Sequence, residues 1–259
     1  MKVPLHVVRA RQARLAALLQ QNQYLPLQTL CATLGVSAAT ARRDLATLAR
    51  ARVITRTRGG ALTDFNQRFP SFRERQFQAH AAKRRLAARA RQALQPGMAV
   101  FFDAGTTVYA IAEALAARPV PRLTAVTNSL PVAELLARVD GMEVNLVGGQ
   151  YLVRQSVLFG DAARRGLRLW KFDCAFLGAE GMTAAGLWNS QRDVVLFQRT
   201  AAQRARRAVF CLDRSKLGLT APEFLLPWVK VDRLLTDATA VELCAADIRL
   251  QQSQLLAAG

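Results

Sequence analysis

The sequence predicts an α/β protein in which a small N-terminal winged helix-turn-helix domain precedes a larger domain with a mainly parallel sheet. Short amphipathic helices around a glycine turn lie near the N-terminus, and a β-branched run with two glycines follows them. From residue 98 onward, short apolar runs alternate with helical stretches, as in a parallel sheet that is buried on both faces. The 259 residues suit one small and one medium-sized domain, which we place at 1–65 and 96–259 around a basic connecting segment at 66–95.

Positive charge is concentrated in the first third of the chain. The formal net charge is +18, of which residues 1–65 contribute +8, from ten Lys and Arg against two Asp. Residues 66–95 contribute +7 from eight against one, and residues 96–259 only +3 from eighteen against fifteen. This asymmetry is typical of a protein whose N-terminal domain binds a polyanion and whose remaining part is nearly neutral. A protein that is basic only because its whole proteome is rich in arginine would carry the charge evenly along the chain.

The rest of the composition argues against several other classes. No run approaches the 18 apolar residues of a membrane span, and the N-terminus lacks the apolar segment of a signal peptide. The four cysteines are scattered without close pairs, which favours reduced thiols in a cytoplasmic protein over a disulfide framework or a zinc site. We therefore expect no metal, no cofactor and no membrane partner.

A helix-turn-helix is predicted in the first fifty residues. Near-helical spacing of apolar residues predicts a helix over 9–22, which Pro26 terminates. A second helix runs from Leu27 to Gly35, and Ser37 is a good N-cap for a third. On this third helix, the side chains opposite the apolar face (Ala41, Leu45, Leu48) are Ala39, Arg43, Ala46, Thr47 and Arg50. Such a small, cationic face fits the major groove of DNA.

A β-hairpin is predicted directly after these helices. Residues 53–62 combine a β-branched run, arginines and a Gly-Gly turn. A hairpin with arginines at its tip is, in this position, a wing that can touch the neighbouring DNA backbone or minor groove. The predicted DNA-binding residues are Ser37, Thr40, Arg42, Arg43, Thr47, Arg56, Arg58 and Gly59.

Six apolar runs are the predicted strands of the larger domain, at 98–102, 123–126, 144–147, 174–177, 209–212 and 231–235. Their C-terminal ends should line up along one edge, where open α/β sheets bind ligands. Small and polar residues at five of these ends predict an effector site: Asp103, Gly105, Thr106, Thr107, Asn128, Ser129, Gly148, Gly149, Gly178, Glu180 and Lys216. Carboxylates and amides suit sugar hydroxyls, whereas Lys216 and the helix N-terminus after Gly105 suit an anion.

The segment 66–95 contains a basic, Ala-rich helix with a Lys83-Arg84-Arg85 run. Two interpretations stay open for this helix. It either links the state of the effector site to the geometry of DNA binding, or it is a charged surface helix that packs an Ala/Leu stripe on the body.

Residues 34–45 (LGVSAATARRDL) and 56–61 (RTRGGA) resemble the DNA-binding signature of DeoR-type repressors. Further matches are 102–107 (FDAGTT), 126–130 (VTNSL), 146–149 (LVGG), 172–181 (FDCAFLGAEG) and 213–216 (DRSK), together with Ser156 and Gly160. The resemblance runs from about residue 9 to residue 237. It implies a sensor fold related to ribose-5-phosphate isomerase, glucosamine-phosphate deaminase and CoA transferases, and a phosphorylated sugar as inducer. It also implies a homo-oligomer, dimer or tetramer, on double-stranded operator DNA.

The resemblance assigns Thr40, Arg42, Arg43 and Asp44 to the recognition helix. Phosphate repels a carboxylate, so we expect Asp44 to brace an arginine instead. The chain departs from the family at Ala41, which replaces Ile, and at Glu180, which replaces Asp. Residues 188–199 lack the expected Glu followed by Lys, for which Arg192, Asp193 and Arg199 are the available substitutes.

The alternative function is a sugar-phosphate isomerase-like or deaminase-like enzyme with an accessory nucleic-acid-binding domain. Its acid and base would be Asp103 and Glu180, because both histidines, His6 and His80, lie outside the α/β body. A constitutive architectural DNA binder would need no sugar site, and the polar strand ends argue against it. We expect a regulator without catalytic residues.

Overall fold

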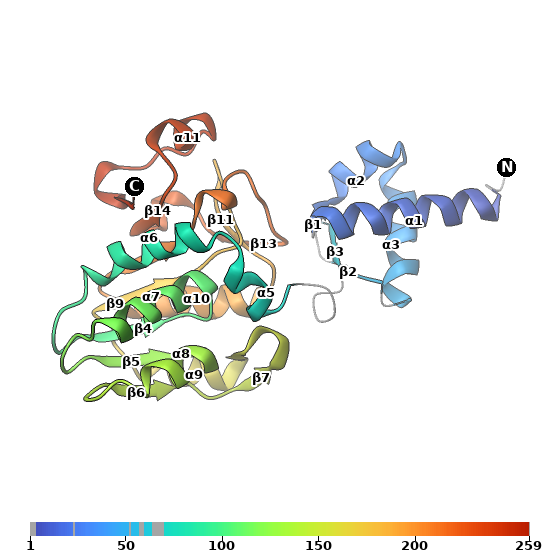
Figure 1. The fold of residues 1–259 in the computed structure, drawn as a ribbon. Coiled ribbons are helices and arrows are strands. Elements are labelled where there is room, and N and C mark those ends of the chain that lie inside the picture. The colour runs from blue at the N-terminus through green and yellow to red at the C-terminus, as the bar shows by residue number, and fades with distance from the viewer. Residues whose placement is uncertain (1–3, 23, 52, 57–59, 64–69, 259) are drawn as a thin grey trace. The chain divides into compact units, whose positions relative to one another are not determined.

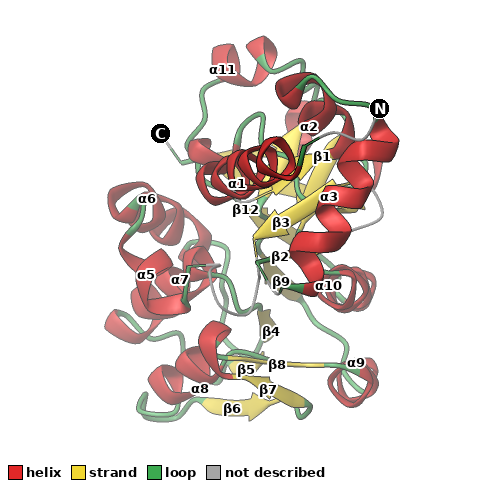
Figure 2. Ribbon diagram, turned by 90° about the vertical axis from the view of Figure 1, so that its right-hand side faces the viewer, coloured by secondary structure: helices red, strands yellow, loops and turns green. Residues whose placement is uncertain are grey.

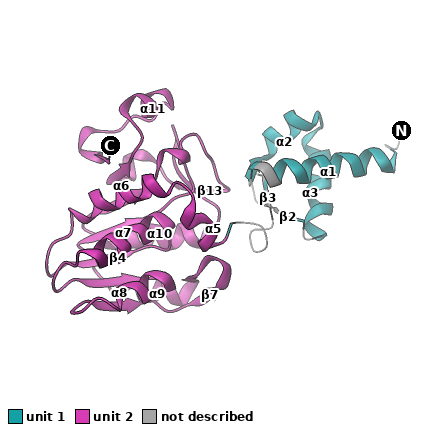
Figure 3. Ribbon diagram, in the orientation of Figure 1, with its two compact units in different colours: residues 1–70 teal, residues 71–259 magenta. Residues whose placement is uncertain are grey.

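The computed structural model describes residues 4–22, 24–51, 53–56, 60–63 and 70–258. The chain divides into two compact units, Met1–Pro70 and Ser71–Gly259 (Figure 3). Each unit has an apolar core of its own. From Ser71 onward, the residues of the predicted connecting segment lie in the second unit.

The first unit combines helices with a small antiparallel sheet of strand order β1-β3-β2 (Figure 2). Its elements are α1 (Leu5–Asn22), β1 (Tyr24–Pro26), α2 (Leu27–Leu34), α3 (Ala38–Arg50), β2 (Ile54–Arg56) and β3 (Gly60–Thr63). β2 and β3 pair antiparallel with Ile54 opposite Thr63, so the predicted hairpin is confirmed. Within the described ranges, none of the helices has both the length and the apolar character that a membrane-crossing segment needs.

Local signals explain the turn between α2 and α3. Gly35 ends α2 with a φ of +63°, in the left-handed region that glycine enters without strain. The N–H of Thr40 donates to Oγ of Ser37 at 3.3 Å, so the predicted N-cap of α3 is confirmed. Leu30 and Leu45, one from each helix, are buried in the core of this unit.

Asp44 is buried even though it lies on the cationic helix α3. Its Oδ2 accepts Nε of Arg11 at 2.6 Å, and its Oδ1 accepts Nη2 of Arg11 at 3.2 Å and Nε2 of Gln12 at 3.0 Å. Both donors belong to α1, so this group ties the first helix to the third. The expectation that Asp44 braces an arginine is confirmed.

The second unit is built on a seven-stranded sheet in which every neighbouring pair of strands is parallel. Its strands in spatial order are β15 (Leu255–Ala257), β14 (Arg233–Thr236), β12 (Ala208–Cys211), β9 (Cys174–Leu177), β4 (Ala99–Phe102), β5 (Thr124–Thr127) and β6 (Glu143–Leu146). Six of them match the predicted strands to within two residues, and β15 is an addition.

Helices cover both faces of this sheet (Figure 1). The described helices of this unit are α5 (Phe72–Phe77), α6 (His80–Arg91), α7 (Thr106–Ala117), α8 (Leu130–Leu136), α9 (Asp161–Arg168), α10 (Arg192–Arg204) and α11 (Ala240–Ala245). Val100 and Phe102 of β4 belong to the core formed with α6, α7 and α8, whereas Phe101 between them belongs to the core with α9 and α10. Successive side chains of a strand point to opposite faces, so β4 is apolar throughout because both faces are covered.

Shorter elements, which the sequence patterns do not indicate, complete the second unit. An antiparallel sheet contains β10 (Gly181–Thr183), β11 (Gly186–Asn189) and β13 (Glu223–Leu226), and a second contains β7 (Gln150–Leu152) and β8 (Val157–Phe159). The 3₁₀ helices are η1 (Val153–Gln155), η2 (Arg214–Lys216), η3 (Trp228–Lys230) and η4 (Gln252–Gln254).

The strand order reverses between β4 and β9. The chain passes from β4 to β5 and β6 on one side, then returns to β9 on the other side of β4 and continues to β12 and β14. The connections after two such strands leave in opposite directions, and ligands of open α/β sheets bind at this point. Here Asp103 follows β4 and Gly178 follows β9.

Candidate nucleic-acid interface and effector site

α3 has one exposed, cationic face. Its exposed residues are Ala38, Ala39, Arg42, Arg43, Thr47 and Arg50. The small side chains leave room for the helix to approach a groove, and the arginines can reach bases or phosphates. The hydroxyls of Ser37 and Thr40 lie 3.1 Å apart at the start of this helix.

The structure describes the two strands of the predicted wing, β2 and β3. Arg56 is the last residue of β2 and Gly60 the first of β3. The predicted contacts Arg58 and Gly59 lie outside the described residues.

Asp103 stands at the reversal of the strand order and is 3% exposed. Its Oδ2 accepts the N–H of Gly178 at 3.2 Å and Nε2 of Gln198 at 2.6 Å. Burial raises the pKa of Asp103, and the hydrogen bonds from Gln198 and Gly178 and the charge of Arg75 oppose this rise. The loops after β4 and β9 therefore meet at a buried carboxyl group.

A chain of hydrogen bonds joins Asp103 to a second carboxylate. Asn189 Nδ2 donates to Gln198 Oε1 at 3.0 Å, and the N–H of Ser190 donates to Asn189 Oδ1 at 2.8 Å. Ser190 Oγ then donates to Glu180 Oε1 at 2.6 Å. We call Asp103, Glu180, Asn189, Ser190 and Gln198 the carboxylate network. Its carboxylates supply the acceptors that sugar hydroxyls require.

Two predicted glycines allow the loops to come close together. A Cβ on Gly105 would lie 3.7 Å from Cα of Gly178. Gly105 is also the N-cap residue of α7, and no described side chain caps that helix. Thr106 and Thr107 follow in its first turn and are buried. The N-terminal end of α7, with its partial positive charge, thus lies next to Asp103 in the sequence.

The charges of three cations from different elements act on this network or on one another: Arg75 of α5, Lys83 of α6 and Lys216 of η2. Burial raises the pKa of Glu180, and the hydrogen bond from Ser190 and the charges of Arg75 and Lys216 oppose this rise. Lys83 in turn interacts with the charges of Lys216 and Arg75. We call Arg75, Lys83 and Lys216 the cationic group. Only Lys216 is among the predicted site residues.

Two buried amide atoms lack a hydrogen-bond partner among the described residues: Asn128 Oδ1 and Gln155 Nε2. Asn128 directly follows β5 at the carboxyl edge and is fully buried. Gln155 is 8% exposed, and its Oε1 accepts Nη2 of Arg75 at 2.9 Å. An orphaned buried polar atom costs about 1–3 kcal/mol, so an acceptor and a donor remain at this edge for a polar ligand.

Other predicted residues have a role in the fold itself. Ser129 Oγ accepts the N–H of Val132 at 3.4 Å and thereby caps α8. Gly149 has a φ of +134°, and a Cβ there would lie 2.4 Å from the carbonyl oxygen of Phe159. Packing therefore explains Gly149 and Ser129 without a ligand, and Gly148 is the neighbour of Gly149 in the same turn.

In residues 188–199, the side chain that reaches Asp103 is that of Gln198, which is not one of the predicted substitutes. Of the suggested substitutes, Arg199 donates through Nε to the carbonyl of Leu225 at 2.8 Å and through Nη2 to that of Phe224 at 2.9 Å. Gln198, one residue earlier, reaches Asp103. Its amide also donates to the carbonyl of Gly178 at 2.8 Å.

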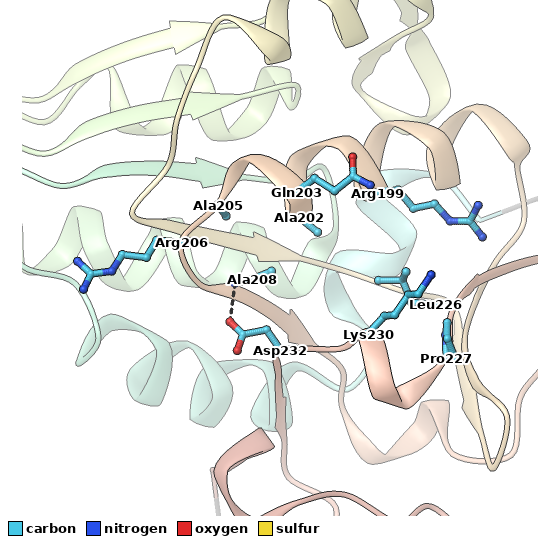
Figure 4. Close-up of a pocket in the computed structure, with 10 residues that line it drawn as sticks. All are labelled: Arg199, Ala202, Gln203, Ala205, Arg206, Ala208, Leu226, Pro227, Lys230 and Asp232. Carbon is cyan, nitrogen blue, oxygen red and sulfur yellow. Dashed lines mark hydrogen bonds between the residues drawn. The ribbon is translucent and has the colours of Figure 1, made fainter.

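A pocket of about 480 Å³ lies elsewhere, at the N-terminal ends of the strands (Figure 4). Its lining includes Ala208, the first residue of β12, whose N–H donates to Asp232 Oδ2 at 3.1 Å. Lys230 and Arg206 add positive charge. The carboxylate network follows the C-terminal ends of the strands, so this pocket is not the predicted effector site.

Lys83 provides a pH-dependent prediction. Burial lowers its pKa to about 8, Asp213 acts in the opposite direction, and Lys216 and Arg75 lower it further. Above that pH the unfolded chain retains a proton that the folded protein has lost, up to the ordinary lysine pKa of about 10.4, so unfolding becomes less favourable as pH rises. Relative to Lys83→Gln, the wild type should gain unfolding free energy between about pH 7.5 and about pH 9.5 in urea titrations.

The control for this measurement is Arg84→Gln, because Arg84 is an exposed neighbour on the same helix. Groups common to all the variants cancel in the difference. A wild-type advantage that stays constant over the pH range would show that Lys83 is not the titrating group.

Models of known protein families match both units of the chain. Residues 11–67 match the DeoR-like helix-turn-helix domain, and residues 78–238 match the DeoR C terminal sensor domain. The chain is 31% identical over 231 residues to the HTH-type transcriptional repressor GlcR of Bacillus subtilis, with 88% of each chain covered. It is 32% identical over 234 residues to the HTH-type transcriptional regulator GlpR of Haloferax volcanii, covering 88% of this chain and 89% of that one. Ribose 5 phosphate isomerase A from Neisseria gonorrhoeae is 23% identical, with a TM-score of 0.37 over 52% of each chain.

Proposed function

The chain belongs to the DeoR family of transcription regulators, and on this basis we propose that it represses genes of carbohydrate metabolism until a small phosphorylated sugar binds its second unit. The first unit binds DNA through its helix-turn-helix, and the second senses an effector. The relatives are regulators rather than enzymes, so Asp103 and Glu180 are assigned to ligand binding and not to catalysis. The observation that carries the proposal is the carboxylate network at the reversal of the strand order, on which the charges of Arg75 and Lys216 act.

The two groups suit different parts of a sugar phosphate. The carboxylates of Asp103 and Glu180 accept hydrogen bonds from sugar hydroxyls, and Asn128 Oδ1 offers one more acceptor. Lys216 and the N-terminus of α7 attract the phosphate. A neutral sugar would leave the positive charge unused, which is why the proposal specifies a phosphorylated one.

The test is release of DNA by candidate effectors. Fluorescence anisotropy of the fragment upstream of the protein's own gene should report salt-sensitive binding by the full chain. A panel of pentose and hexose phosphates, each paired with its unphosphorylated sugar, is then added. Release by a sugar phosphate and not by its parent sugar supports the proposal. Turnover of the sugar phosphate would instead indicate an enzyme. DNA binding that no compound of the panel changes would indicate a constitutive DNA binder.

We propose further that the protein acts in the cytoplasm as a homo-oligomer, a dimer or a tetramer. Helix-turn-helix regulators commonly place two recognition helices on half-sites about one DNA turn apart, which requires at least two copies. Size-exclusion chromatography with light scattering at working concentration measures the state. A purely monomeric protein that binds its operator with full affinity would contradict this part of the proposal.

Lys216→Ala should weaken effector binding and leave DNA binding intact. The change removes one charge-assisted contact to the phosphate, so about a tenfold loss of effector affinity is expected, or roughly 1.4 kcal/mol. Isothermal titration with the sugar phosphate found in the panel measures the loss, and anisotropy measures DNA affinity. Arg214→Ala is the control, since Arg214 is an exposed cation of the same short helix. Equal effector affinity in the wild type and Lys216→Ala would remove Lys216 from the site.

A further inference from the structure

The pocket at the N-terminal ends of the strands has one wall formed by the last turns of α10 (Figure 4). Arg199, Ala202 and Gln203 stand at positions i, i+3 and i+4, so they share one face of this helix. Ala205 follows the helix and Ala208 begins β12. Alanine side chains end at Cβ, and this wall leaves a space of about 480 Å³ open. Small-molecule sites have volumes of about 300–1,000 Å³, so the pocket has the size of a small organic ligand.

The opposite wall is anchored to the body of the second unit. It contains residues 226–227 and Lys230, the last residue of η3. Trp228, the first residue of η3, is buried, and its carbonyl accepts Nε2 of Gln254 at 3.0 Å. The same Nε2 donates to the carbonyl of Val231 at 2.7 Å. The segment that carries Lys230 is therefore held on both sides of that residue, and the wall is formed before any ligand binds.

One cation of the lining is available to a ligand. The lining contains three cations and one carboxylate, a net charge of +2. The carboxylate, Asp232, is already paired, because its Oδ1 accepts Nη1 of Arg233 at 2.6 Å. Two nitrogens of Arg199 donate to carbonyls of β13, and Arg206 points away from the other labelled side chains (Figure 4). Lys230 is exposed and forms no salt bridge with another described residue.

Two other interpretations of this pocket compete with a ligand site. The pocket is a hollow that holds only water, or it is a contact surface for a second copy of the chain, to which the 88% exposed Val229 of η3 would contribute. A concave space between two anchored walls, with apolar side chains and a single available charge, matches a small ligand better than it matches a flat protein surface.

We propose that this pocket binds a small organic anion, with the charged group of the anion on Lys230 and its apolar part against the alanines of the α10 wall. This site is separate from the effector site, and its existence does not depend on the function proposed above.

Helix α10 joins the two sites. Gln198, the residue before Arg199, donates to Asp103 Oδ2 in the carboxylate network. A ligand that contacts α10 from the pocket therefore changes the affinity of the effector site, and the effector changes the affinity of the pocket by the same factor. This coupling is the part of the inference that rests on the proposed function.

The first test uses phenyl phosphate and benzoate, which carry an anionic group on the same apolar ring. Isothermal titration of the full chain measures their affinities. Inorganic phosphate lacks the ring and benzyl alcohol lacks the charge, so each should bind at least about tenfold more weakly than phenyl phosphate. Both aromatic anions should bind, because lysine is a point charge and not a fork shaped for phosphate. Inorganic phosphate that binds as tightly as phenyl phosphate would contradict the apolar part of the site.

The second test changes the two walls separately. Lys230→Gln removes the charge, and Lys171→Gln removes the same charge from an exposed lysine outside the lining. Ala202→Leu fills the space, and Ala202→Ser keeps it open. We expect Lys230→Gln and Ala202→Leu to weaken phenyl phosphate binding at least about tenfold, and both controls to bind as the wild type does.

Each other result of these titrations overturns the ligand site. Unchanged affinity in both Lys230→Gln and Ala202→Leu would remove the pocket as the place of binding. A loss in Lys216→Ala instead of Lys230→Gln would place the probe in the effector site. If Lys230→Gln or Ala202→Leu changes the molecular mass measured by light scattering while no probe binds the wild type, the pocket is an interface between copies.

The coupling is measured with the sugar phosphate that releases DNA from the wild type. Its affinity is determined without and with saturating phenyl phosphate, and the reverse titration should give the same factor. Lys230→Gln should abolish the difference at the same probe concentration. Independent binding of the two compounds would overturn the route through α10 and leave the site. If no sugar phosphate binds while phenyl phosphate does, the proposed function is wrong and the site still stands.

Discussion

Alanine at Asp44 is expected to lower the unfolding free energy of the DNA-binding unit by about 3 kcal/mol, the largest stability effect predicted for this protein. The carboxylate accepts three hydrogen bonds from Arg11 and Gln12, and the side chains of Asp44 and Arg11 are only 5% and 17% exposed. Removing the carboxylate leaves the guanidinium of Arg11, whose side chain is 17% exposed, without its counter-charge, which costs more than the pair contributes. Urea denaturation followed by circular dichroism would show the loss as an early transition.

A double-mutant cycle identifies the cause of that loss. Arg11→Ala should also be destabilising, because it leaves the carboxylate of Asp44, whose side chain is 5% exposed, with Gln12 as its donor. The double variant should be less destabilised than the sum of the two single variants, with a coupling of roughly 1–3 kcal/mol. Simple additivity would show that the two side chains stabilise the unit independently.

Arg43→Ala is expected to weaken operator binding by about 1–3 kcal/mol, roughly 5- to 150-fold, without unfolding the protein. Arg43 lies on the exposed face of α3, away from the buried Asp44 and Leu45. Its removal therefore takes a DNA contact and leaves the core intact. Anisotropy titrations on the operator and on an unrelated fragment measure both the loss and its dependence on sequence.

The salt dependence of the same titrations shows which contact was lost. If Arg43 binds a phosphate, the slope of log affinity against log salt should fall by about one unit, and both fragments should lose affinity equally. If it reads a base, the operator alone should lose affinity. Arg14→Ala, on an exposed position of α1, controls for the loss of charge. Operator affinity as high in Arg43→Ala as in the control would remove Arg43 from the interface.

The elements that the sequence predicts well are those with strong local signals. Gly35 and Ser37 mark the turn of the helix-turn-helix because one permits a left-handed backbone and the other caps a helix, and both effects act within a few residues. The buried strands of the large sheet are equally visible, as continuous apolar runs. β15 and the two small sheets were not predicted, because most of their strands, such as QYL, GMT and GLWN, contain polar residues or glycine and lack the continuous apolar run of the buried strands.

The candidate site was predictable only on its strand side. Asp103 and Glu180 follow buried strands, so the alignment of parallel strand ends brings them to one edge. Arg75, Lys83 and Gln198 come from helices, and which way a helical side chain faces depends on tertiary packing. Lys83 nevertheless carries a signal: it lies three residues before Leu86 and seven before Ala90, on the buried stripe of α6. A lysine on an apolar stripe indicates a buried charge that requires hydrogen-bond partners.

The hydrogen bonds to Asp103 also determine when the sensor can first work. Gly178 and Gln198 are separated from Asp103 by 75 and 95 residues. Closing loops of that length is slow and entropically costly, so these contacts belong to a late stage of folding. The DNA-binding unit, by contrast, closes its own core within the first 70 residues and leaves the ribosome first. A newly made chain is therefore expected to fold its DNA-binding unit before its sensor unit, and a cut between the units would leave a DNA-binding fragment without a sensor domain.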